Sequence, residues 1–152
     1  MARFILLDAG VLGLACPGSR TPLVASFQPW VHHLIAGGSD VVIPDVTRFE
    51  VRRELLRLRS PARLRLLDDF CAQFASVSVT AEAWDKAAEF WALVRQAGRP
   101  TAHSEAIDAD AILAGVAATI ARPGDEVVIA TTNVRHLNWF PGINAQRWQE
   151  IA

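Results

Sequence analysis

Acidic side chains stand at the edges of apolar segments that lie far apart in the chain. The acids are Asp8, which follows the apolar run 4–7, Glu50, which comes a few residues after the run 41–44, and Asp108 and Asp110, which open the apolar stretch 111–120. In an α/β fold with parallel strands, the carboxyl ends of the strands gather along one edge of the sheet, where ligands bind. Acids collected there repel one another, and a divalent cation relieves the repulsion. Because hard oxygen ligands suit Mg²⁺ or Mn²⁺, a metal-dependent reaction on phosphate is the first hypothesis.

Glu50 has two interpretations. Thr47 and Glu50 have the spacing of a capping box, in which a Glu at the third helical position bonds back to the amide of the N-cap residue. Alternatively, Glu50 is a metal ligand. Glu54 lies one turn later on the same helix face and is the competing ligand, while Arg57, three residues further on, is its expected ion-pair partner. Spacing alone does not decide whether Glu50 or Glu54 is the metal ligand.

The other acids also have structural explanations. A carboxylate directly after a buried strand, such as Asp8, can cap the next turn. Asp108 and Asp110 would point to nearly opposite sides inside a helix, whereas at a helix N-terminus both could point forward, where the helix dipole favours acids. Asp110 directly precedes the long apolar stripe and is therefore the better ligand candidate of the two.

Polar residues also follow the last long apolar run, 127–130. They are Thr131, Thr132 and Asn133. Hydroxyl and amide groups at the end of a strand can hold a water molecule, a metal ion or a phosphate. A turn is the alternative, since Asn favours turns.

The basic residues are concentrated rather than spread evenly. The net charge is −1, yet 14 of the 15 basic residues are Arg, and seven of them lie between Arg48 and Arg65. Arginine suits bidentate contacts with phosphate, so Arg48, Arg52 and Arg53 are candidates for gripping a nucleic-acid backbone. The alternative is an ordinary solvated helix face.

The elements that must position these residues alternate between strand and helix. With 152 residues, of which 51% are hydrophobic, the chain is expected to form one domain, 1–152. Such alternation favours a three-layer α/β/α arrangement around a mainly parallel sheet of four or five strands. The predicted strands are 3–8, 41–43, 77–79, 127–131 and a short 143–145, and the predicted helices are 23–36, 47–58, 61–74, 81–96 and 104–121.

Several classes of protein lack support in the sequence. Cys16 and Cys71 do not make a disulfide framework, and reduced thiols are expected. The four histidines show no zinc spacing, and there is no Gly-rich phosphate loop or Gly-x-Ser-x-Gly elbow. No signal peptide or apolar run of about 20 residues is evident, so a cytoplasmic protein without a membrane partner is expected.

Four segments together resemble PIN-domain ribonucleases, in particular the toxins of bacterial VapC-like toxin–antitoxin pairs. The segments are 4–8, 43–55, 108–115 and 128–133. The resemblance implies a PIN-like α/β/α fold, an acidic cluster that binds metal, and cleavage of RNA. It aligns Asp8, Glu50 and Asp110 with the first, second and third family acids, and it makes Asp108 a supporting acid.

The chain departs from the family pattern at two places. The family commonly has Ser or Thr and then Asn after the first acid, where this chain has Ala9 and Gly10. The fourth family acid is often Asp, where this chain has Asn133. Asn can still bind a metal ion or orient a water molecule, but it removes one negative charge, and the number of metal ions, one or two, stays open.

The sequence is therefore interpreted as a Mg²⁺- or Mn²⁺-dependent endoribonuclease that cleaves single-stranded or structured RNA. Asp8, Glu50 and Asp110 would be catalytic and, with Asp108 and Asn133, would hold the metal. RNA would be contacted by Arg48, Arg52, Arg53, Thr131 and Thr132. A cognate antitoxin is the expected protein partner, and a homodimer stays open.

Two other functions are weighed against this interpretation. One is a PIN-like module of weak catalytic activity that binds RNA or protein, which Ala9, Gly10 and Asn133 motivate. The other is an α/β phosphatase with Asp8 as nucleophile, which needs a second acid two residues later, where Gly10 stands.

Overall fold

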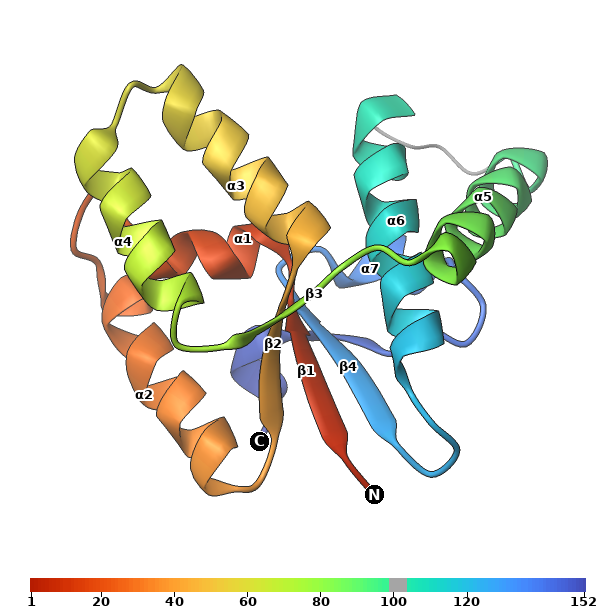
Figure 1. Ribbon diagram of the computed structural model, residues 1–152, viewed down its shortest axis with the longest axis horizontal. Helices are drawn as coiled ribbons and strands as arrows, with labels where there is room; N and C mark the ends of the chain where they lie inside the picture. Colours follow the sequence, from red (N-terminus) through yellow and green to blue (C-terminus); the bar gives the residue numbers. More distant parts are fainter. Residues whose placement is uncertain (99–103) are drawn as a thin grey trace.

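A parallel sheet of five strands forms the centre of the computed structural model, which describes residues 1–98 and 104–152 (Figure 1). The strands are β1 (Arg3–Leu7), β2 (Asp40–Pro44), β3 (Ala75–Val77), β4 (Glu126–Thr131) and β5 (Ala145–Arg147). Their order is β3-β2-β1-β4-β5, and all neighbouring pairs are parallel. The expected parallel sheet is therefore confirmed, with five strands.

Helices cover both faces of this sheet. In Figure 1, α1 to α4 lie on one side of the strands and α5 to α7 on the other. They are α1 (Ala9–Leu12), α2 (Pro22–Ala36), α3 (Asp45–Arg57), α4 (Pro61–Cys71), α5 (Ala81–Gln96), α6 (Ser104–Ile120) and α7 (Val134–Leu137), with short 3₁₀ turns at Gly13–Ala15 and Trp148–Glu150. None of the helices in the described residues has the length and apolar character needed to cross a membrane.

The alternation of side chains along β1 divides the core into two layers. Ile5 and Leu7 belong to a cluster that contains Phe27 of α2, while Leu6 belongs to a second cluster with Phe90 of α5. All three β1 residues are fully buried. Because successive strand residues point to opposite faces, the continuous apolar run of β1 supports a helical layer on each side.

The sheet brings the ends of β1, β2 and β4 to one edge. Leu7 at the end of β1 pairs with Ala130 of β4, and Leu6 pairs with Val42 of β2. Asp8 therefore follows β1 at the edge where β4 ends in Thr131.

Helix α6 packs closely on α5 through a small residue. A Cβ atom added to Gly115 would lie 2.5 Å from the Ala83 carbonyl oxygen and 3.1 Å from the Ala87 Cβ. A glycine is thus required for the two helices to approach this closely. The close packing sets the position of α6, which carries Asp108 and Asp110, relative to α5.

The helix that carries Glu50 begins earlier than predicted. The chain leaves β2 at Pro44, which is the N-cap of α3, so Thr47 is the third helical residue instead of the N-cap. Thr47 is fully buried, and its hydroxyl has no hydrogen-bond partner among the described residues. The capping-box interpretation of Thr47 and Glu50 is therefore wrong.

Smaller differences concern short elements. The third strand lies at 75–77 instead of 77–79, because the chain then turns into α5, where the Thr80 hydroxyl accepts a hydrogen bond of 3.1 Å from the Ala83 amide. The fifth strand lies at 145–147 instead of 143–145. Helices α1 and α7 were not expected, since each has only four residues and no helical repeat to reveal it.

Candidate active site

Asp8 is held firmly at the end of β1. Its Oδ1 accepts a hydrogen bond of 2.8 Å from the Ala9 amide, which makes Asp8 the N-cap of α1, and its Oδ2 accepts one of 2.7 Å from the Thr131 hydroxyl. Burial raises the pKa of Asp8 above its usual value, although the bonds from Thr131 and Ala9 act in the opposite direction. Asp8 therefore caps α1, as the sequence suggested, and its position also allows a role in the site.

Glu50 of α3 and Asp110 of α6 lie within electrostatic range of Asp8. Burial, followed by the charge of Asp8, raises the pKa of Glu50 to about 7, although Arg53 acts against this. Burial, followed by the charges of Asp8 and Glu50, raises the pKa of Asp110 to about 7. The fold therefore brings together the three acids that the sequence analysis placed at the centre of the site. Asp8, Glu50 and Asp110 are called the acid cluster below.

The donor chemistry of the acid cluster fits a hard divalent cation. Three half-buried carboxyl groups, in which the charge of Asp8 raises the pKa of the other two, gain from a bound positive charge, and carboxylate oxygens are the ligands that Mg²⁺ and Mn²⁺ prefer. In the part of the chain that the structure describes, no three acidic, histidine or cysteine side chains already stand in a complete metal-holding arrangement. The fit consequently rests on charge and ligand type.

Asp108 and Asp110 both lie inside α6, which starts four residues before Asp108. Their side chains therefore diverge. Asp108 is exposed and lines a cavity with Trp84 and Ile112, while Asp110 is half-buried in the acid cluster. The preference for Asp110 agrees with this arrangement, and the role of Asp108 as a supporting ligand stays a prediction.

Glu54, the competing ligand, is occupied elsewhere. It forms the expected ion pair with Arg57, and the hydrogen bond from Arg57 lowers the pKa of Glu54. Glu54 is exposed on the next turn of α3. Of the two glutamates, Glu50 is the one that interacts with Asp8.

The segment after β4 supports Asp8 through a chain of hydrogen bonds. The backbone amide of Asn133 donates a hydrogen bond of 2.9 Å to the Thr131 hydroxyl, and that hydroxyl donates to Asp8. Thr131 is fully buried, so the predicted contact of Thr131 with RNA is not compatible with its position. Thr131 is instead a positioning residue for Asp8, which could be suspected only from the pairing of β1 with β4.

Asn133, which the sequence resemblance aligns with the family's fourth acid, is exposed beside α7. Its side-chain nitrogen lies 2.9 Å from Nδ1 of His136, a residue that the sequence analysis did not select. As the amide nitrogen is a donor, His136 Nδ1 accepts in this arrangement. A metal contact of Asn133 stays a prediction.

The glycine at position 10 is explained by its neighbour Thr132. A Cβ atom on Gly10 would lie 2.8 Å from the Thr132 hydroxyl oxygen, so a larger residue at this position would require the Thr132 side chain to shift. Thr132, exposed at the end of β4, thus places a hydroxyl beside the position where the family pattern has a side chain on α1.

The three arginines proposed for RNA binding fall into two groups. Arg48 and Arg52 bind Asp68 of α4, with N···O distances of 3.0 and 2.9 Å. Arg53 is exposed, lies 5.4 Å from the centre of the Phe49 ring, and is close enough to Glu50 to lower its pKa. Arg53 is the member of the group that lies at the acid cluster.

Comparison with solved structures identifies the fold. VapBC2 from Rickettsia felis, bound to a DNA fragment from its promoter, is similar with a TM-score of 0.73 and 12% identity over 95% of this chain and 98% of that chain. DNA-bound VapBC from Salmonella typhimurium is similar with a TM-score of 0.69 and 19% identity over 97% of this chain and 99% of that chain. FitAcB from Neisseria gonorrhoeae is similar with a TM-score of 0.69 and 18% identity, again over 97% of this chain and 99% of that chain. No protein-family profile and no curated protein sequence matches the chain. The likeness in structure, at low identity, shows that this chain has the PIN-like fold of VapC.

Proposed function

We propose that this protein is a Mg²⁺- or Mn²⁺-dependent endoribonuclease and the toxin of a toxin–antitoxin pair. The observation that carries the proposal is the acid cluster at the carboxyl edge of a PIN-like sheet, where burial raises the pKa of all three acids and the charge of Asp8 raises those of Glu50 and Asp110 further. Perturbed carboxyl groups gathered at such an edge are typical of functional sites.

The residues divide the work as follows. A divalent ion, when bound, would lower the pKa of a water molecule and stabilise charge on the phosphate. Asp8, Glu50 and Asp110 would hold that ion, and each carboxyl group must lose its proton to do so. The hydroxyl of Thr131 keeps Asp8 Oδ2 in one direction, which limits the rearrangement that binding requires.

Arg53 supplies positive charge next to this acidic site. A phosphate group that approaches three carboxyl groups is repelled unless a cation lies nearby. Arg53 is exposed and adjacent to Glu50, so its guanidinium can contact the phosphate beside the one that is cleaved.

A cognate antitoxin is proposed as the protein partner. This follows from the likeness to structures described as VapBC and FitAcB, which cover nearly all of this chain. A cytoplasmic location, expected from the sequence, belongs to the same proposal, and a homodimer stays open.

The decisive experiment is metal-dependent cleavage of RNA. Purified protein should cut single-stranded RNA in Mn²⁺ or Mg²⁺, and excess chelator should stop the reaction. Asp8→Asn keeps the shape of the side chain and removes its charge, so it should abolish cleavage while circular dichroism stays unchanged. RNA binding without cleavage by the wild-type protein under all metal conditions would instead favour the weakly catalytic binding module.

A further inference from the structure

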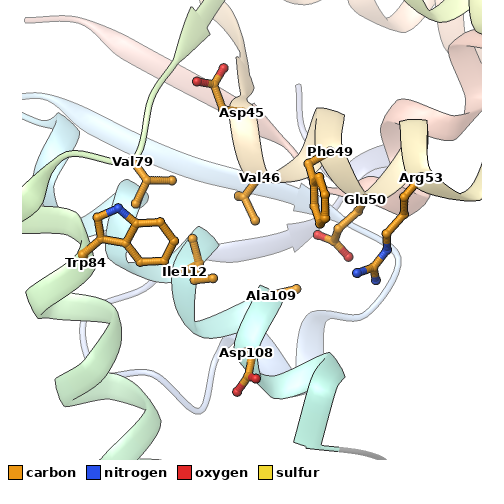
Figure 2. Close-up of a pocket in the computed structure, with 10 residues that line it drawn as sticks. All are labelled: Asp45, Val46, Phe49, Glu50, Arg53, Val79, Trp84, Asp108, Ala109 and Ile112. Atoms are coloured by element: carbon orange, nitrogen blue, oxygen red, sulfur yellow. The ribbon is translucent and has the colours of Figure 1, made fainter.

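A cavity of about 450 Å³ lies beside the acid cluster, between α3, α5 and α6. It shares Glu50 with the cluster. Figure 2 shows the Trp84 indole on one side of this cavity and the Phe49 ring and Glu50 on the other, with Val46 and Ile112 between them. Cavities of roughly 300–1,000 Å³ are of the size that holds small organic groups.

Two aromatic side chains in the walls of the cavity are more than half exposed. Phe49 is 60% exposed and Trp84 is 52% exposed, although both lie on helices whose other faces are packed. Neither ring belongs to the two hydrophobic core clusters. Flat exposed rings next to a phosphate-processing site are the surfaces on which unpaired bases stack.

Charge is distributed so that a neutral ring is favoured inside the cavity and a phosphate outside it. Asp45 and Asp108 stand at the rim and repel a phosphate group. Arg53 lies at the end near Glu50, with its guanidinium over the Phe49 ring. A nucleotide can therefore place its base between the aromatic residues and its phosphate against Arg53.

We propose that this cavity is a base-binding subsite for single-stranded RNA, in which Trp84 and Phe49 stack an unpaired nucleobase next to the scissile phosphate. The inference rests on the proposed ribonuclease function and adds to it the residues that determine sequence preference. Because the cavity shares Glu50 with the acid cluster, a base bound in it would lie next to the phosphate that the acid cluster would cleave.

The test compares Trp84 with a second exposed tryptophan on the same helix. Trp91 is 39% exposed on α5 and does not line this cavity, so Trp91→Ala is the matched control. The variants Trp84→Ala, Trp84→Phe and Trp91→Ala are made in the Asp8→Asn protein, which leaves the RNA intact. Affinity is measured for a single-stranded RNA that the wild-type protein cleaves, with an abasic nucleotide placed at each position around the cleavage site.

If Trp84 stacks on one base, removing the indole and removing that base should weaken RNA binding through the same interaction. Trp84→Ala should weaken binding by roughly 5- to 150-fold, the equivalent of ~1–3 kcal/mol per stacked base, while Trp84→Phe keeps most of the affinity and Trp91→Ala all of it. One abasic position should weaken binding to the Trp84-containing protein by a similar factor and should have no further effect in Trp84→Ala.

The possible failures can be told apart. The subsite is refuted, and the ribonuclease function stands, if the wild-type protein cleaves RNA but Trp84→Ala binds it normally. The same holds if the losses of RNA affinity caused by Trp84→Ala and by an abasic nucleotide are additive at every position. If Trp84→Ala retains RNA binding and loses affinity for a protein partner, the cavity is a protein-docking site instead. If the wild-type protein neither binds nor cleaves RNA, both proposals fall.

Discussion

Two charged groups of side chains share helix α3 and differ in how their charges are balanced. Arg48 and Arg52 form ion pairs with Asp68. Burial alone would raise the pKa of Asp68, but the hydrogen bonds from these two arginines lower it below its usual value. On another face of the helix, burial and then the like charge of Asp8 raise the pKa of Glu50 to about 7. One group is compensated by its partners within the chain, and the other is not.

The difference separates surface structure from a site. The side chains of the Arg48, Arg52 and Asp68 group are each more than two-fifths exposed, and ion pairs of that kind contribute little to stability. A cluster of partly buried like charges costs free energy, and a chain retains such a cluster where a ligand balances it. The following predictions test whether the acid cluster is such a site and whether the Asp68 group is not.

Neutralising Glu50 should have the largest effect. Glu50→Gln keeps the shape of the side chain and removes a ligand charge, so Mn²⁺ affinity should fall by more than the ~10- to 100-fold that loss of a supporting group costs. Calorimetric titration of the purified protein measures this. Glu54→Gln is the matched control, since Glu54 is one turn away and paired with Arg57, and it should bind Mn²⁺ like the wild type. The reverse pattern would transfer the ligand role to Glu54.

Removing the hydroxyl of Thr131 should have the next largest effect. Thr131→Val preserves the volume in the core but leaves Asp8 Oδ2 without its 2.7 Å donor, so RNA cleavage in Mn²⁺ should fall by ~10- to 100-fold. Thr131→Ser retains a hydroxyl and should recover most of the activity. Thermal unfolding is measured for both variants so that activity is compared on folded protein. Equal cleavage by Thr131→Val and wild type would show that Asp8 needs no such support.

These comparisons also show which features a sequence can reveal. Asp8 was predictable because a carboxylate directly after a buried apolar strand is unexpected for packing alone. The start of α3 was not, because the Thr47–Glu50 spacing fits a capping box whether or not Thr47 lies at the N-cap, and Pro44 can also precede a helix directly.

Contacts between segments that are distant in sequence could not be predicted from local sequence patterns. Arg48 and Arg52 look like free phosphate ligands until α4 places Asp68 beside them. The buried position of Thr131 follows from the pairing of β4 with β1. The sequence therefore predicted the type of fold and which three acids lie near one another, while the supporting and competing partners required the tertiary structure.

The acid cluster should make the metal-free protein less stable as pH rises. In the unfolded chain Glu50 and Asp110 lose their protons near their usual pKa values of 4.5 and 3.8, while in the folded chain both keep them up to about 7. Between these values the folded state binds more protons, so the free energy of unfolding decreases from pH 3.8, where Asp110 of the unfolded chain titrates, to about pH 7 and then levels off. Asp68, whose pKa is lowered, affects stability below this window.

Asp110→Asn should weaken that decrease and stabilise the metal-free protein at pH 8 by ~1–3 kcal/mol, because it removes one repelled charge. Urea unfolding in chelator at several pH values measures the effect. Asp108→Asn, two residues away on the exposed side of α6, should keep the wild-type pH dependence. Identical profiles for the two variants would mean that Asp110 is not part of the repulsive cluster.

The arginines should show the smallest difference, in the salt dependence of RNA binding. For a single strand the logarithm of the affinity falls with the logarithm of the salt concentration by about 0.7 per phosphate contact. Arg53→Gln in the Asp8→Asn protein should reduce that slope by about one contact, since Arg53 is exposed at the acid cluster. Arg52→Gln should leave the slope unchanged, because Asp68 already neutralises Arg52 within the chain. A slope that responds to Arg52 and not to Arg53 would place the RNA backbone along α4 and reverse the assignment of the two charged faces of α3.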